Sequence, residues 1–135
     1  MTDWASLQAP SLADLEKMAT AAFARLPEDF RALCRDLVIR VEDFPDDETL
    51  REMDLESEFD LLGLFRGIGL AQGSAQLQTG QFPNMIWLYR RPILDYWAEH
   101  EETLGHLVTH VLVHEIGHHF GLSDEDMEAI EAAAG

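Results

Sequence analysis

The order of elements along the sequence predicts a single α+β domain that spans residues 1–135. Helical patterns occupy both ends of the chain, and short runs rich in β-branched and aromatic residues lie between them. The predicted order is α, β, loop, β, β, α, α. The length of 135 residues suits one domain and is enough to bury a core without disulfides.

Two helices are predicted near the N-terminus. Ser11 can cap the first, because its side chain can accept a hydrogen bond from the first turn. Apolar residues then recur at helical spacing up to Leu26, and Pro27 ends this helix. A second short helix is predicted over residues 28–34.

Three strands are predicted in the middle of the chain. Residues 37–41 are rich in β-branched side chains, and residues 60–65 and Met85–Tyr89 are short apolar runs between turn signals. The acidic stretch 42–60 is predicted as a solvated loop with one helical turn. The Gly- and Gln-rich stretch 67–80 is predicted as a second loop.

The longest helical pattern lies near the C-terminus. Residues 95–120 read as helical, and the second half of this range carries an apolar stripe at helical spacing. Gly121 ends the pattern as a left-handed residue would. Ser123 is the predicted cap of a last short helix over residues 124–134.

Charge and composition exclude several classes of partner. The formal net charge is −17, from 26 acidic residues against nine basic ones, so the chain repels phosphate backbones and anionic lipids. Neither nucleic acid nor a membrane is therefore expected as a partner. With no signal peptide and no apolar run of about 18 residues, a cytoplasmic protein is expected. The lone Cys34 can form no intrachain disulfide, and its apolar neighbours predict a buried thiol without a catalytic role.

The residues suited to catalysis gather in the last third of the chain, where all six histidines lie. His114 and His118 are four residues apart, so on a helix both imidazoles project from one face and can reach one metal ion. Glu115 lies beside that metal, where it can hold and deprotonate a bound water. The HEIGH segment, residues 114–118, therefore predicts one zinc ion held by the two histidines, with Glu115 as the catalytic base.

A catalytic zinc needs a third protein ligand and an open position for water. Gly121 lets the helix end sharply, so the chain can turn back and bring Asp124 to the metal from outside the helix. A carboxylate oxygen is an accepted zinc ligand, which makes Asp124 the predicted third ligand. Glu125 and Glu128 are the alternatives for this role.

The remaining histidines are weaker candidates. His110 lies one turn before His114, but this pair lacks the neighbouring glutamate and the downstream turn, so His110 is expected to be packed or to support a ligand. His119 is rotated away from the ligand face and is expected to be packed or hydrogen-bonded. His106 drifts off the helical stripe, and His100 is expected at the surface.

The run HEIGHHFGLSD, residues 114–124, resembles the extended zincin signature, in which a histidine pair and a glutamate precede a glycine turn and a third ligand. It is similar to the short bacterial family of zincin-like zinc metallopeptidases, the minimal metalloproteases. The resemblance implies a zincin-like domain with a small mixed sheet packed against the active-site helix. It also implies zinc ligation by His114, His118 and Asp124, with Glu115 as base. Larger metzincins differ, because they usually place histidine where this chain has Asp124.

The expected function is that of a zinc metallopeptidase, a hydrolase that cleaves peptide bonds with a zinc-activated water and Glu115 as general base. The substrate, a peptide or protein, is expected to add as a strand beside a sheet edge near Met85–Tyr89. Tyr89, Arg90 and Tyr96 are oxyanion candidates by residue type alone. Two other hypotheses stand beside this one: a non-catalytic zinc-binding or protein-interaction domain, and a zinc hydrolase of a non-peptide substrate. The sequence does not fix the oligomeric state.

Overall fold

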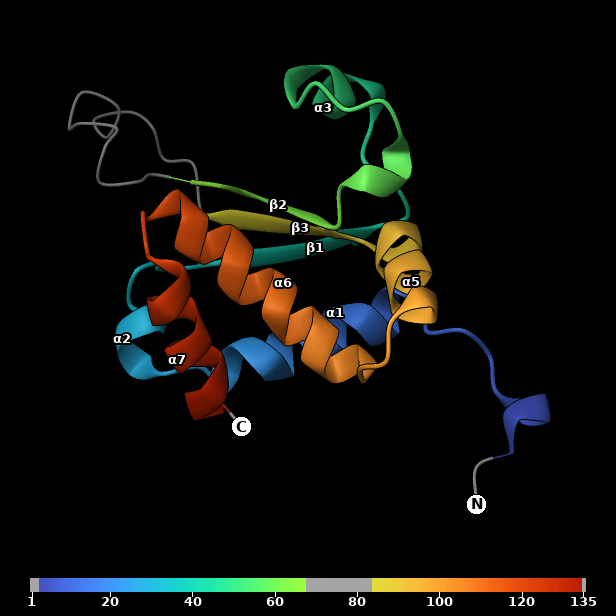
Figure 1. Ribbon diagram of the computed structural model, residues 1–135, viewed down its shortest axis with the longest axis horizontal. Helices are drawn as coiled ribbons and strands as arrows, with labels where there is room; N and C mark the ends of the chain where they lie inside the picture. Colours follow the sequence, from blue (N-terminus) through green and yellow to red (C-terminus); the bar gives the residue numbers. More distant parts are fainter. Residues whose placement is uncertain (1–2, 68–83, 135) are drawn as a thin grey trace.

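A computed structural model describes residues 3–67 and 84–134, and this part of the chain contains a three-stranded sheet with helices packed around it (Figure 1). The strands are β1 (Val38–Glu42), β2 (Gly63–Arg66) and β3 (Met85–Tyr89). The helices are α1 (Leu12–Ala24), α2 (Glu28–Arg31), α3 (Asp47–Glu52), α5 (Arg90–Glu99), α6 (Leu104–His119) and α7 (Asp124–Ala134). Short 3-10 turns lie at Trp4–Ser6 and Glu58–Asp60. The predicted α+β class is confirmed.

The sheet is mixed, with the strand order β1-β3-β2. β1 runs parallel to β3, with Val38 opposite Met85, and β2 runs antiparallel to β3, with Gly63 opposite Leu88. Because β3 is hydrogen-bonded on both sides, it has no free edge. The prediction that a peptide adds near Met85–Tyr89 is therefore wrong. The pattern of a strand reveals its burial but not its place in the sheet.

Helices α1 and α6 lie side by side on one face of the sheet, α1 against β1 and α6 against β2 (Figure 1). Alternate side chains of β3 point to opposite faces. Ile86 and Leu88 join the main core with α1 and α6, whereas Trp87 and Tyr89 pack with Leu61 and other residues of a smaller cluster. The sheet is therefore a support on which α6 rests through its apolar side.

The predicted helical range 95–120 is in fact two helices, α5 and α6. The helical conformation is interrupted between them, where the Trp97 indole donates a hydrogen bond to the Glu102 carbonyl at 2.9 Å. Thr103 then caps α6, because its hydroxyl accepts a hydrogen bond from the backbone of His106 at 3.1 Å. The helical pattern had merged the two helices because apolar spacing alone does not mark this cap.

The other boundaries follow the sequence with small shifts. Ser11 caps α1 as predicted, and the Asp14 carboxylate accepts in return from the Ser11 backbone at 2.9 Å. The acidic stretch 42–60 holds α3 and a 3-10 turn, with Asp46 capping α3 through the Thr49 backbone at 2.8 Å. The predicted loop 67–80 lies outside the described residues except for its first residue, Gly67. No helix in the described ranges is long and apolar enough to cross a membrane.

Candidate metal centre

The orientation of α6 is set by its apolar residues. Eight of them are buried against the sheet, α1 and α7: Leu104, Leu107, Val108, Val111, Leu112, Val113, Ile116 and Gly117. The histidines occupy the remaining side of the helix, where His110 and His118 are exposed and His114 is half-buried. Burial of the apolar stripe thus turns a row of imidazoles, one helical turn apart, toward solvent and α7.

The chain reverses direction immediately after α6. Gly121 has φ +77°, a left-handed conformation that glycine adopts without a Cβ penalty. The backbone N–H of Leu122 donates to the Gly117 carbonyl at 2.9 Å, and that of Gly121 donates to the His118 carbonyl at 3.2 Å, which closes the helix end. Ser123 then caps α7, accepting from the Asp126 backbone at 3.0 Å. The predicted roles of Gly121 and Ser123 are confirmed.

The predicted ligands are distributed around this turn. His114 and His118 lie on adjacent turns of α6, with ring centroids 5.6 Å apart. Asp124 is exposed in the first turn of α7. Among the described residues, these three side chains do not form a group whose ligand atoms all lie within 4.8 Å of one another. The predicted centre is therefore not assembled in this arrangement of the side chains.

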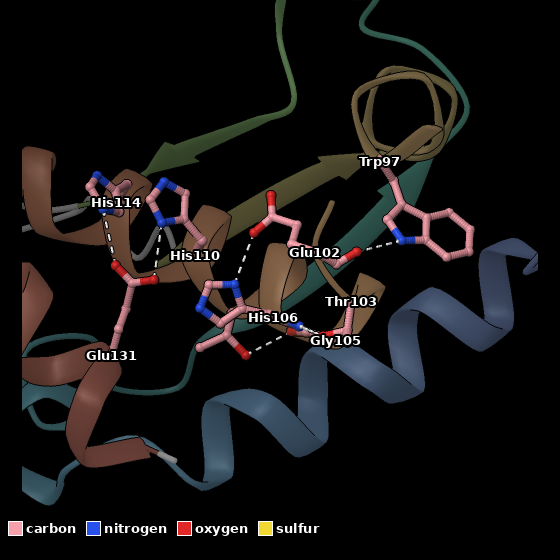
Figure 2. Close-up of polar contacts among 9 residues, drawn as sticks. Trp97, Glu102, Thr103, Gly105, His106, His110, His114 and Glu131 are labelled. Atoms are coloured by element: carbon pink, nitrogen blue, oxygen red, sulfur yellow. Dashed lines mark hydrogen bonds and ion pairs between the residues drawn. The ribbon is translucent and has the colours of Figure 1, made fainter. Parts of the chain in front are cut away.

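A different group of three does meet that distance: His110, His114 and Glu131. The Glu131 carboxylate lies at the edges of both rings, with one oxygen 3.0 Å from His110 Nδ1 and the other 3.2 Å from His114 Nε2 (Figure 2). The rings themselves stack with centroids 3.9 Å apart. The His110–His114 pair thus has a glutamate after all, supplied by α7 and not by its own helix.

Sequence reasoning missed Glu131, although a signal for it exists. Met127 is fully buried against α6, and Glu131 lies four residues later on the same helix. Residues four apart share a helix face, so the face of α7 that packs on α6 also carries Glu131. Recognising Met127 as the packing residue of α7 would have pointed to this carboxylate.

Glu115 differs from the other acidic residues of the chain. It is half-buried on α6, and its carboxylate makes no hydrogen bond or ion pair with any described residue. Burial disfavours the charged form and raises the pKa of Glu115 from 4.5 to about 7. A carboxyl group with this pKa can both accept and release a proton near neutral pH.

The remaining histidines occupy structural positions. The ring of His119 packs against the ring of Phe65, with centroids 4.7 Å apart. Its Nε2 is buried without a hydrogen-bond partner among the described residues, and burial lowers the pKa of the imidazole. His119 is therefore packed, as expected, and its burial favours the neutral ring. His106 lies 2.9 Å from a Glu102 oxygen, and the exposed His100 stacks on Tyr96 at 3.7 Å.

The three oxyanion candidates are engaged elsewhere. Tyr89 packs in the smaller cluster, away from the face that α6 covers, and burial raises its pKa to about 12. The Arg90 guanidinium donates to the Pro10 carbonyl at 2.6 Å and to an Asp43 carboxylate oxygen at 3.2 Å. Tyr96 lies on α5 against His100. None of the hydrogen bonds, ion pairs or ring contacts that these three side chains make with described residues involves the HEIGH segment.

Imidazole nitrogens and carboxylate oxygens are the donors that zinc prefers when no thiolate is present, so this end of α6 fits a zinc ion chemically. A family model described as zincin-like metallopeptidase matches residues 34–134, a range that contains β1 to α7. No curated protein matches the chain.

Proposed function

The chain belongs to the zincin-like metallopeptidase family, and on that premise we propose that it hydrolyses peptide bonds with one zinc ion held at the HEIGH segment. The observation that carries the proposal is the position of Glu115. This carboxyl group directly follows His114, precedes His118 by less than one turn, and has no partner among the described residues. A half-buried carboxyl group free of protein partners suits a general base better than a structural role.

His114 and His118 would hold the metal, with Asp124 as the third ligand. The left-handed Gly121 supports this assignment, because it returns the chain to α6 and starts α7 at Asp124. Both His118 and Asp124 are exposed and free of hydrogen bonds and ion pairs among the described residues, so a change of rotamer meets no competing partner. Glu125 and Glu128, also exposed on α7, are the alternative ligands.

When bound, zinc supplies a Lewis acid that activates water and polarises a carbonyl group. Glu115 takes the proton of the attacking water and returns it to the leaving amine nitrogen. Its burial favours the neutral form, which stabilises the carboxyl group while it carries that proton.

The substrate side of the centre is the edge of β2. β2 pairs with β3 on one side, and no other described strand pairs with it. β2 packs closely against α6: a Cβ added to Gly63 of β2 would lie only 2.8 Å from Val111 Cγ1 of α6. An extended peptide that adds to this edge would therefore run alongside the helix that carries Glu115. The net charge of −17 favours peptides with basic residues.

The proposal is tested by comparing wild type with Glu115→Gln. Zinc content is measured by mass spectrometry, and cleavage is measured on a diverse peptide library. Glu115→Gln should retain zinc and lose cleavage by about 10²-fold or more, since general-base catalysis contributes that much. Glu99→Gln, an exposed substitution at the end of α5, is the matched control and should cleave normally. Stoichiometric zinc without cleavage of any peptide by wild type would contradict the proposal and favour a non-catalytic or non-peptide role.

A further inference from the structure

We propose that His110, His114 and Glu131 form a second site for zinc or a similar divalent transition metal, and that this site shares His114 with the HEIGH segment. The inference goes beyond the proposed function, in which neither His110 nor Glu131 takes part. It rests on side chains that already face one another across two helices (Figure 2).

The distances are close to those of a metal site. The ligand atoms of the three residues lie within 4.8 Å of one another, and the two contacts to Glu131 measure 3.0 and 3.2 Å. In a tetrahedral zinc site with bonds near 2.0–2.1 Å, ligand atoms are about 3.4 Å apart. Side-chain movements of about 1 Å would therefore bring all three atoms to one ion.

The ligand set also selects the class of metal. Two imidazole nitrogens and one carboxylate oxygen suit zinc, cobalt or nickel, whereas calcium and magnesium prefer sites made of oxygen alone. The side chain of His110 is 46% exposed and that of Glu131 is 14% exposed. The site is therefore open to solvent on the His110 side, which leaves room for a water ligand, and desolvated around the carboxylate.

Glu131 is held in place by the packing of α7. Met127, four residues earlier, is fully buried against Gly117 of α6. This contact holds the face of α7 that carries Glu131 toward the histidines. His106 and Glu102 make a comparable contact at 2.9 Å, but no third ligand atom joins them in the described ranges. That pair provides a natural control.

Sharing His114 makes the two sites exclusive. A neutral imidazole has one nitrogen with a free lone pair and one that carries hydrogen, so it ligates one metal ion at a time. His114 Nε2 faces Glu131 in this structure, and the same side chain is the first ligand of the HEIGH segment. The wild-type chain should therefore hold one metal ion, either with His118 or with His110 and Glu131.

The test removes His118, the second histidine ligand of the HEIGH segment, and measures whether the chain still binds a metal ion. His118→Ala, an exposed substitution, should still bind one Co²⁺, measured by equilibrium dialysis and by the visible absorption of coordinated cobalt. Adding His110→Ala or Glu131→Gln should weaken that binding at least tenfold. Adding His106→Ala should leave it unchanged. Circular dichroism of each variant shows whether the fold is retained.

Two results would overturn the second site. One is a folded His118→Ala chain that binds no cobalt. The other is binding that persists unchanged after His110→Ala or Glu131→Gln. Failure of the proposed function would look different, because wild type would then show no cleavage while His118→Ala bound cobalt as tightly as wild type did.

Discussion

Met127 fills the space that Gly117 leaves by having no side chain. A Cβ built on Gly117 would lie 2.5 Å from the sulfur of Met127 and 2.9 Å from its Cγ. Met127 is fully buried, so α7 meets α6 at the glycine inside the HEIGH segment. This contact holds the turn of α7 that carries Glu131 beside His110 and His114.

Replacing Gly117 by alanine should lower the free energy of unfolding by about 1 kcal/mol. Overpacking of a buried contact costs about 1–3 kcal/mol, and the higher helix propensity of alanine returns about 1 kcal/mol. Denaturant unfolding measures the difference. Gly105→Ala on the same helix is the control: no atom lies within 4 Å of the added Cβ, so stability should be unchanged or higher. Equal stabilisation by both variants would contradict this prediction, because it would mean that the Met127 side chain moves aside without a cost in stability.

Replacing Asp124 by alanine should weaken zinc binding by more than about tenfold, because even a partner outside the ligand shell contributes 10–100-fold. The measurement is made in a His110→Ala background, which leaves zinc no second site. Glu125→Ala and Glu128→Ala are the matched controls on α7 and should bind zinc like the parent. If one of them weakens binding and Asp124→Ala does not, that glutamate is the third ligand.

The metal-free chain should lose stability as the pH rises from about 4.5 to about 7 because of Glu115. Its folded pKa of about 7 lies above the ordinary value of 4.5, so the unfolded chain ionises first as pH rises. Stability is thus retained below pH 4.5 and falls until the pH passes about 7. One pKa unit corresponds to about 1.4 kcal/mol. After allowance for partial exposure, the free energy of unfolding of Glu115→Gln should rise by roughly 1–3 kcal/mol relative to that of wild type over this pH range.

Urea unfolding of both proteins in the presence of a chelator measures this difference. Other titrating groups contribute equally to both chains, so only the change in the wild-type-to-variant difference matters. A difference that stays constant from pH 5 to pH 8 would mean that Glu115 is solvated like an ordinary carboxylate.

Cys34 should resist alkylation in the folded chain. Its side chain is buried, and burial raises the pKa of the thiol to about 11, so little thiolate forms at neutral pH. Iodoacetamide followed by mass spectrometry should modify Cys34 in guanidinium but leave it intact in buffer. Similar rates under the two conditions would contradict its placement in the core.

Local signals in the sequence predicted three helix boundaries, whereas the start of α5 and the break between α5 and α6 were missed. Ser11, Gly121 and Ser123 act through hydrogen bonds or backbone angles within a few residues, so their roles can be read without knowledge of the fold. The three strands were also found, because their apolar runs are local. The α+β class followed from the order of these elements.

Relationships between distant residues could not be read in the same way. The central position of β3 depends on pairing with β1 and β2, which an apolar pattern does not specify. Glu131 reaches His114 from 17 residues away, and only because α7 packs on α6 through Met127. Proximity of this kind is a property of tertiary packing, and the spacing within HEIGH carries no information about it.

The most direct test of the zinc centre is anomalous scattering at the zinc edge from crystals of His110→Ala grown with zinc. The variant lacks the second site, so the ion can choose only the HEIGH centre. We predict one anomalous peak within bonding distance of His114 and His118, with an Asp124 oxygen as third ligand and Glu115 beside the ion but not bound to it. A zinc ion that does not contact His118, or no zinc on α6 at all, would contradict the account.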